Sequence, residues 1–79
     1  ILSIALFYMK IVYSFHSKMR MNERKIKEED IKEIISFPEY TLKRGEEIEA
    51  YKKIGSVMLK VVYVVKENYI KVITVYPLG

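Results

Sequence analysis

The stretch VMLKVVYVVKENYIKVITVYP, residues 57–77, decides the fold of this 79-residue chain. Its first part, Val57 to Lys66, is nearly continuous in apolar residues, which is typical of a central strand covered on both faces. Glu67-Asn68 predicts a hairpin turn, because Asn tolerates the left-handed conformation that such turns use. Tyr69 to Tyr76 predicts the returning strand, which ends at Pro77. We therefore expect an antiparallel hairpin here.

A third strand is predicted just before this hairpin. Between Glu46 and Lys53, Ile48 and Ala50 alternate with charged residues, as expected for a strand with one face in water. Gly55-Ser56 predicts the turn into the next strand. The C-terminal half is therefore expected to be a three-stranded antiparallel meander.

The N-terminal half predicts one strand and two short helices. Lys10 to Phe15 is rich in β-branched and aromatic residues, which favours a strand. Ser17 is a candidate cap for the first helix. Acidic residues 28–30 begin a second helix, which ends at Phe37-Pro38 and has an apolar stripe of Ile31, Ile34 and Ile35. The predicted fold class is α+β, with the helices on one face of a curved sheet.

The first residues of the chain are treated separately. Residues 1–15 are almost all apolar, but they are fewer than the roughly 18 needed to cross a bilayer, and they lack the basic start of a secretory signal. Met9 begins a segment typical of a natural first strand. Residues 1–8 are therefore interpreted as an apolar extension that need not be native, and residues 9–79 as a single domain. The alternative is a membrane-proximal or truncated hydrophobic anchor.

Composition narrows the chemistry. Without cysteine there is no disulfide framework, thiol nucleophile or thiolate-bound zinc, and a single histidine cannot build a multi-histidine metal site. We therefore expect no metal and no cofactor. The lack of cysteine is compatible with a cytoplasmic location. The absence of Gln and the excess of Ile, Val, Lys, Glu and Tyr are typical of proteins from hot environments.

The positive charge is concentrated in one segment. The whole chain carries a net charge of +4, and residues 18–27 hold five bases against Glu23 alone. Clustered Lys and Arg concentrate polyanions, so this segment predicts a phosphate-binding surface. The alternative is a solvated helix face.

Several segments together resemble a known family. They are HSKMRMNERKI at residues 16–26, the helix ending at Phe37-Pro38-Glu39, the strand Val61-Val62-Tyr63 and the ending VITVYP at residues 72–77. This set is similar to an uncharacterised family of small prokaryotic domains, one of the numbered domains of unknown function. That family resembles in turn the RelE/ParE and BrnT-type toxins of toxin–antitoxin systems. The similarity covers about residues 9–78.

The joint between the two helices departs from that family's pattern. Lys25 stands where Gly is usual, and Lys27 stands where a capping Ser or Thr is usual. We therefore expect a less sharp break between the helices.

The resemblance implies a RelE-like fold and cleavage of RNA, on the ribosome or free, neutralised by a cognate antitoxin. Metal-independent cleavage needs a base for the 2′-OH, cations for the phosphate and an acid for the leaving oxygen. His16 has the one side chain whose ordinary pKa suits proton transfer near neutrality. Arg20 and Arg24, one helical turn apart, are candidates to clamp phosphate. These three residues are the predicted catalytic group.

A second group is predicted to bind RNA. Tyr63 and Tyr76 are candidates to stack on a base or to donate to phosphate, and Arg44 or Lys60 to complete the positive charge. The predicted RNA-binding residues are Lys18, Lys25, Arg44, Lys60, Tyr63 and Tyr76.

Each assignment has a structural alternative. His16 could close the strand-to-helix junction by a backbone hydrogen bond, Arg20 could pair with Glu23 or the second helix, and the tyrosines could only cover the sheet. The second functional hypothesis is a non-catalytic module that binds RNA, DNA or protein, with His16 buried away from the arginines. A third is an accessory protein of a mobile element. Exposed sheet edges also predict a homodimer formed by strand pairing.

Overall fold

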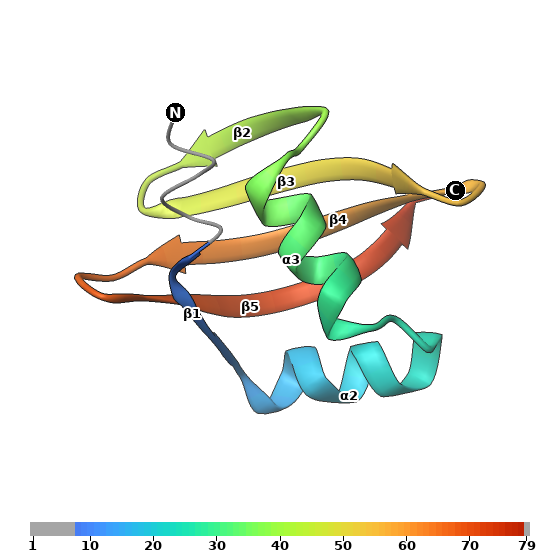
Figure 1. Cartoon of the computed structure of the whole chain (residues 1–79), viewed down its shortest axis with the longest axis horizontal. Helices are drawn as coiled ribbons and strands as arrows, with labels where there is room; N and C mark the ends of the chain where they lie inside the picture. The colour runs from blue at the N-terminus through green and yellow to red at the C-terminus, as the bar shows by residue number, and fades with distance from the viewer. Residues whose placement is uncertain (1–7, 79) are drawn as a thin grey trace.

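The computed structural model describes residues 8–78 and has an α+β fold (Figure 1), which confirms the predicted class. Two helices, α2 (Phe15–Arg24) and α3 (Glu28–Ser36), accompany one five-stranded mixed sheet. The strands are β1 (Lys10–Tyr13), β2 (Tyr40–Arg44), β3 (Glu47–Ile54), β4 (Val57–Val65) and β5 (Tyr69–Leu78). Their order in the sheet is β1-β5-β4-β3-β2, with β1 parallel to β5 and the other pairs antiparallel.

The meander has four strands, so the predicted three-stranded meander is wrong. The missing strand is β2, which pairs with β3 along its whole length across a turn at Gly45-Glu46. Gly45 has a φ of 61°, a conformation that glycine adopts without the steric cost of a Cβ. All five residues of β2 are exposed, so the sequence carries no alternation of apolar and polar residues that would reveal the strand.

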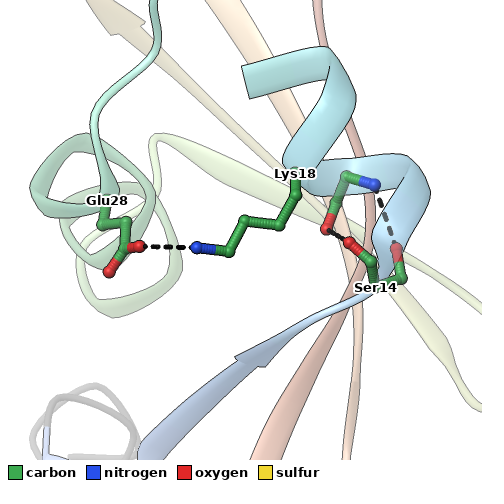
Figure 2. A network of polar contacts seen from close by, with 4 residues as sticks. Ser14, Lys18 and Glu28 are labelled. Atoms are coloured by element: carbon green, nitrogen blue, oxygen red, sulfur yellow. Dashed lines mark hydrogen bonds and ion pairs between the residues drawn. The ribbon is translucent and has the colours of Figure 1, made fainter. Parts of the chain in front are cut away.

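The first strand is shorter than predicted, and its end is the start of α2. Ser14 donates its N–H to the carbonyl oxygen of Val72 at 3.0 Å and its hydroxyl to that of Ile73 at 2.8 Å, which ties the junction to β5. The Ser14 Oγ also accepts from the Ser17 N–H at 3.0 Å, and the Ser17 hydroxyl donates to the Ser14 carbonyl at 2.8 Å (Figure 2). Ser14 is therefore the N-cap, and the prediction of Ser17 was wrong by one turn.

The break between the helices is sharp, contrary to expectation. Lys25 adopts a left-handed conformation with φ 57° and ψ 41° at the end of α2. The N–H of Ile26 donates to the Met21 carbonyl at 2.9 Å, and that of Lys25 to the Asn22 carbonyl at 3.4 Å, which is the Schellman pattern of helix termination. Helix α3 then begins at Glu28, as predicted.

The core lies between α3 and one face of the sheet. The predicted stripe of Ile31, Ile34 and Ile35 is at most 1% exposed and packs on side chains of the central strands. Those side chains are Ala50, Leu59, Val61, Tyr63, Ile70, Val72 and Val75. The helix α2 contributes Met21 and lies against β5 (Figure 1). Within residues 8–78, no helix covers the opposite face of the sheet, and none is long and apolar enough to span a bilayer.

The left-handed Lys25 gives a stability prediction. A residue with a Cβ in this conformation costs roughly 1–2 kcal/mol, partly offset by the greater freedom of glycine in the unfolded chain. We expect Lys25→Gly to raise the free energy of unfolding by about 1 kcal/mol in urea titrations. The control is Glu23→Gly, an exposed position inside α2, which should lower it by about 1 kcal/mol. An equal loss in both variants would contradict the assignment of the helix end.

Candidate nucleic-acid interface

The orientation of α2 decides where its cations point. Ser17 and Met21 are its buried residues and face the sheet. His16 directly precedes Ser17, and Arg20 directly precedes Met21. Successive residues of a helix are rotated by about 100°, so the side chains of His16 and Arg20 both project to the same side of the buried pair. Lys18 follows Ser17 by one residue and projects to the other side. His16 and Arg20 therefore lie on one flank of α2, and Lys18 lies on the opposite flank.

The Lys18 flank is the one that faces α3. The Lys18 Nζ lies 3.1 Å from a carboxylate oxygen of Glu28 (Figure 2) and 5.4 Å from the centre of the Tyr13 ring. Burial, and then the nearby Glu28 charge, raises the pKa of Tyr13 to about 12, so its ring stays neutral. Lys18, predicted to bind RNA, is thus in an exposed ion pair on the helix-covered side. His16 and Arg20 consequently lie on the flank of α2 turned toward the other face of the sheet.

The predicted catalytic residues share one stripe. His16 and Arg24 are exposed and Arg20 is half-buried, at positions spaced by four residues along α2. Within residues 8–78, no carboxylate lies within ion-pair distance of either arginine, and the imidazole of His16 makes no hydrogen bond. Arg24 and the exposed Lys25 stand at the end of the helix, beside a shallow hollow that Asp30 of α3 and Leu59 of β4 also line, so this end of the stripe lies toward the helix-covered side. The structural alternatives proposed for His16 and Arg20 are therefore not found among these residues.

A polar cluster occupies the sheet face opposite α3, which we call the open face. Its centre is Glu49 on β3, whose carboxylate lies 3.0 Å from the Nε of Arg44 and 3.7 Å from the Nζ of Lys60. The Tyr51 hydroxyl donates to the same carboxylate at 3.0 Å. The Glu49 side chain is only 9% exposed, although no described helix covers it. It is screened by side chains of its own sheet.

The register of the strands brings these residues together. Tyr51 on β3 lies opposite Lys60 on β4, which in turn lies opposite Tyr76 on β5. Directly paired residues project from the same face of a sheet, so all three side chains are neighbours on the open face. The stacked Tyr40 ring, 4.5 Å from that of Tyr51 between centroids, extends the row to β2. An ammonium group and three tyrosines thus line one open surface.

The Lys60 ammonium is held between two of these rings. Its Nζ lies 5.1 Å from the centre of the Tyr76 ring and 5.7 Å from that of Tyr51, within cation–π range. A hydrogen bond with Tyr76 raises the pKa of Lys60, and the Glu49 charge adds to this against the effect of burial. These contacts therefore favour the charged form of Lys60.

The charge of Glu49 is also maintained. Burial by itself would raise the pKa of this carboxyl, but the hydrogen bond from Tyr51 and the charges of Lys60 and Arg44 together lower it below its ordinary value. Burial, followed by the hydrogen bond to Glu49, raises the pKa of Tyr51, so that phenol keeps the proton it donates. The cluster is therefore a preorganised set of two cations around one anion, with one net positive charge.

Tyr63 does not belong to this surface. Its side chain is 2% exposed and packs in the core below α3, where burial raises the pKa of its phenol. The alternation along β4 places Tyr63 with Leu59 and Val61 on the helix-covered face, whereas Lys60 projects from the other. The prediction that Tyr63 contacts a base is therefore wrong.

Sequence reasoning also missed three members of the cluster. Glu49, Tyr51 and Tyr40 were not among the predicted site residues. A signal existed for the first two, because their spacing of two residues places them on one face of a predicted strand. None existed for Tyr40, since its strand was not predicted.

Three of the predicted RNA-binding residues, Arg44, Lys60 and Tyr76, do meet on the open face. No three His, Asp or Glu side chains within residues 8–78 come together as metal ligands would.

The family of the chain is shown by comparison with known proteins. The model of a domain of unknown function, DUF4258, matches residues 13–77, which include α2 and the whole open-face cluster. The chain belongs to the DUF4258 family. No curated protein and no solved structure matches this DUF4258 chain. The predicted membership of a numbered domain of unknown function is therefore confirmed.

The lowered pKa of Glu49 predicts a pH dependence of stability. The unfolded chain takes up a proton at this carboxyl near its ordinary pKa of 4.5, whereas the folded chain does so only at lower pH. The stabilisation is thus fully present above pH 4.5 and is lost as the pH falls through the folded value. In urea titrations, the difference in stability between the wild type and Glu49→Gln should be constant above that pH and should decrease below it.

The control is Glu47→Gln, which removes an exposed carboxylate from the same strand. If this variant reproduced the pH-dependent difference, the Glu49 cluster would not be its source.

Proposed function

We propose that this chain is a toxin-like endoribonuclease of RelE-like architecture that cleaves single-stranded RNA without a metal ion. The observation that supports this most is that two cationic groups face the same side of the molecule. One is the pair His16 and Arg20 on α2, and the other is the cluster around Lys60 on the open face. The His16 and Arg20 flank of α2 is turned toward the open face, and α2 lies against β5, which carries Tyr76. An RNA strand crossing from α2 onto the sheet would meet both groups in turn.

The residues on α2 can supply the first steps of cleavage. The exposed imidazole of His16 can accept the proton of a 2′-OH as this oxygen attacks the adjacent phosphate. Arg20, without a carboxylate partner among the described residues, can stabilise the charge that develops on the phosphate oxygens, and Arg24 can hold the next phosphate. The attack forms a 2′,3′-cyclic phosphate and releases the 5′-oxygen of the next nucleotide, which takes a proton from water, while His16 returns the 2′-OH proton to the solvent.

The open face can hold the neighbouring nucleotides. The exposed Tyr40 ring and the half-buried Tyr76 ring offer flat surfaces on which unpaired bases stack, typically with about 1–3 kcal/mol per base, whereas Tyr51 is buried beneath Tyr40. The Arg44 side chain is 69% exposed, so it can reach a phosphate while it is also held by Glu49. Because one anion offsets two cations, this surface attracts RNA without being a strongly charged patch. A cognate antitoxin would neutralise the activity by covering this side.

One observation favours a second candidate, a non-catalytic RNA-binding module on the same scaffold. Lys60 is fixed by Glu49 and two rings and keeps its proton, which suits a binding cation better than a proton donor. Such a module needs the open face and Arg20 but has no use for the imidazole of His16.

The test uses the purified chain, a labelled single-stranded RNA and EDTA. We expect products with 2′,3′-cyclic phosphate and 5′-hydroxyl ends. His16→Ala should reduce the cleavage rate by about 100-fold or more, as expected for loss of a general base, while RNA affinity stays close to that of the wild type. Arg20→Ala should lower both the cleavage rate and the RNA affinity. The control is Asn22→Ala, on the opposite flank of α2.

Three results would decide against cleavage by this site. Cleavage by His16→Ala at the wild-type rate would show that the imidazole has no catalytic role. Salt-sensitive binding without any cleavage by the wild type would favour the non-catalytic module. If the wild type neither binds nor cleaves RNA, then RNA is not the ligand of this surface.

A further inference from the structure

The two edges of the sheet differ in how they are protected. At one edge β1 has only four residues and is followed by α2, which lies against β5. At the other edge stands β2, whose five residues are all exposed and whose outer side pairs with no strand within residues 8–78 (Figure 1). Its range Tyr40–Arg44 contains no proline and no bulge. Two basic side chains, Lys43 and Arg44, stand on this edge, but its outward backbone groups remain a template for another strand.

The hydrogen-bonding groups on that outer side can be assigned. Across the two-residue turn at Gly45-Glu46, Arg44 and Glu47 form the hydrogen-bonded pair that closes the hairpin. The backbone groups of an antiparallel strand point alternately to its two sides, so Leu42 also bonds to β3. Thr41 and Lys43 consequently direct their N–H and C=O groups outward, where a further strand would find them.

We propose that β2 pairs antiparallel with β2 of a second copy of this chain, centred on Thr41. This register is self-complementary. Glu39 of each copy lies opposite Lys43 of the other. One oxygen of the Glu39 carboxylate accepts the Lys53 N–H of its own copy at 2.9 Å, and the other oxygen is the one that would meet the Lys43 ammonium in each of two opposite-charge pairs. Tyr40 lies opposite Leu42 of the other copy, and these are exposed apolar side chains, 49% and 44% accessible. Thr41 meets Thr41 at the two-fold axis, a favourable pair in itself.

The same register agrees with the backbone. The two Thr41 residues exchange N–H···O=C bonds across the axis, and each Lys43 N–H reaches the Glu39 carbonyl of the other copy. The Glu39 N–H already donates to the Tyr51 carbonyl at 2.8 Å, so each Glu39–Lys43 pair is joined by one backbone hydrogen bond, from the Lys43 N–H, and the Lys43 carbonyl stays open to water. Paired residues share a face, so the dimer is one continuous sheet with both open faces on the same side. The contact is small, and association is therefore weak and concentration-dependent.

The decisive variant is Thr41→Pro, which removes the outward N–H without breaking a bond to β3. Proline is tolerated in a strand where its missing N–H faces outward. In analytical ultracentrifugation, the average mass of the wild type should rise with protein concentration from 9.4 kDa toward twice that value. Thr41→Pro should raise the dimer dissociation constant by about 100-fold, tenfold for each hydrogen bond across the axis. The control Thr41→Val keeps the N–H and should associate like the wild type.

A charge exchange tests the register itself. Lys43→Glu places two glutamates opposite two others and should weaken its own dimer by about tenfold, and Glu39→Lys should do the same with lysines. Mixed together, these two variants restore both opposite-charge pairs and should form a heterodimer. Circular dichroism verifies that each variant is folded.

Several outcomes would overturn the proposal, and none of them depends on RNA cleavage. A wild-type mass of 9.4 kDa at every concentration excludes the dimer. Association of folded Thr41→Pro as strong as that of Thr41→Val places the contact elsewhere. If Thr41→Pro is monomeric but the mixed Lys43→Glu and Glu39→Lys variants associate no more strongly than either variant alone, the register centred on Thr41 is rejected.

Discussion

The burial of one isoleucine stripe against one face of the sheet is the constraint on which the rest of the structure depends. Ile31, Ile34 and Ile35 are almost completely buried, and they are the side chains through which α3 joins the core of the sheet. Because α3 sits across β3 and β4 and α2 lies against β5, both helices are used on one side. In the part of the chain that the structure describes, the opposite face is covered only by the sheet's own side chains.

That face is held together by polar contacts in place of a second layer. Glu49 would be costly to shield from water alone, but two cations and a phenol surround it. The result is a surface that is ordered and still accessible, with Lys60 between Tyr51 and Tyr76. Such a surface suits a ligand that carries both charge and flat rings, which is the reason that RNA is the ligand we propose.

The two edge strands of the sheet, β1 and β2, differ in their contacts. Ser14 joins β1 to α2 and binds two carbonyl groups of β5, so the short strand β1 is anchored to the sheet by local hydrogen bonds. The β2 edge has no such device among the described residues, and its exposed pair of Tyr40 and Leu42 lies beside free backbone groups. Pairing of β2 with its own copy about a two-fold axis is isologous and uses up this edge, so it produces a closed dimer.

The sequence by itself determined the α+β class, the stripe and span of α3, three of the four meander strands and the cationic segment of α2, because each follows from local periodicity or composition. Only the tertiary structure decided the rest. Strand β2 exists because β3 pairs with it, and Tyr63 is buried because of the face on which β4 places it. Glu49 became the centre of a cluster because the register brings Arg44, Tyr51 and Lys60 around it. Contacts between strands distant in sequence leave no local pattern, since each strand alone satisfies its own periodicity whichever neighbour it meets.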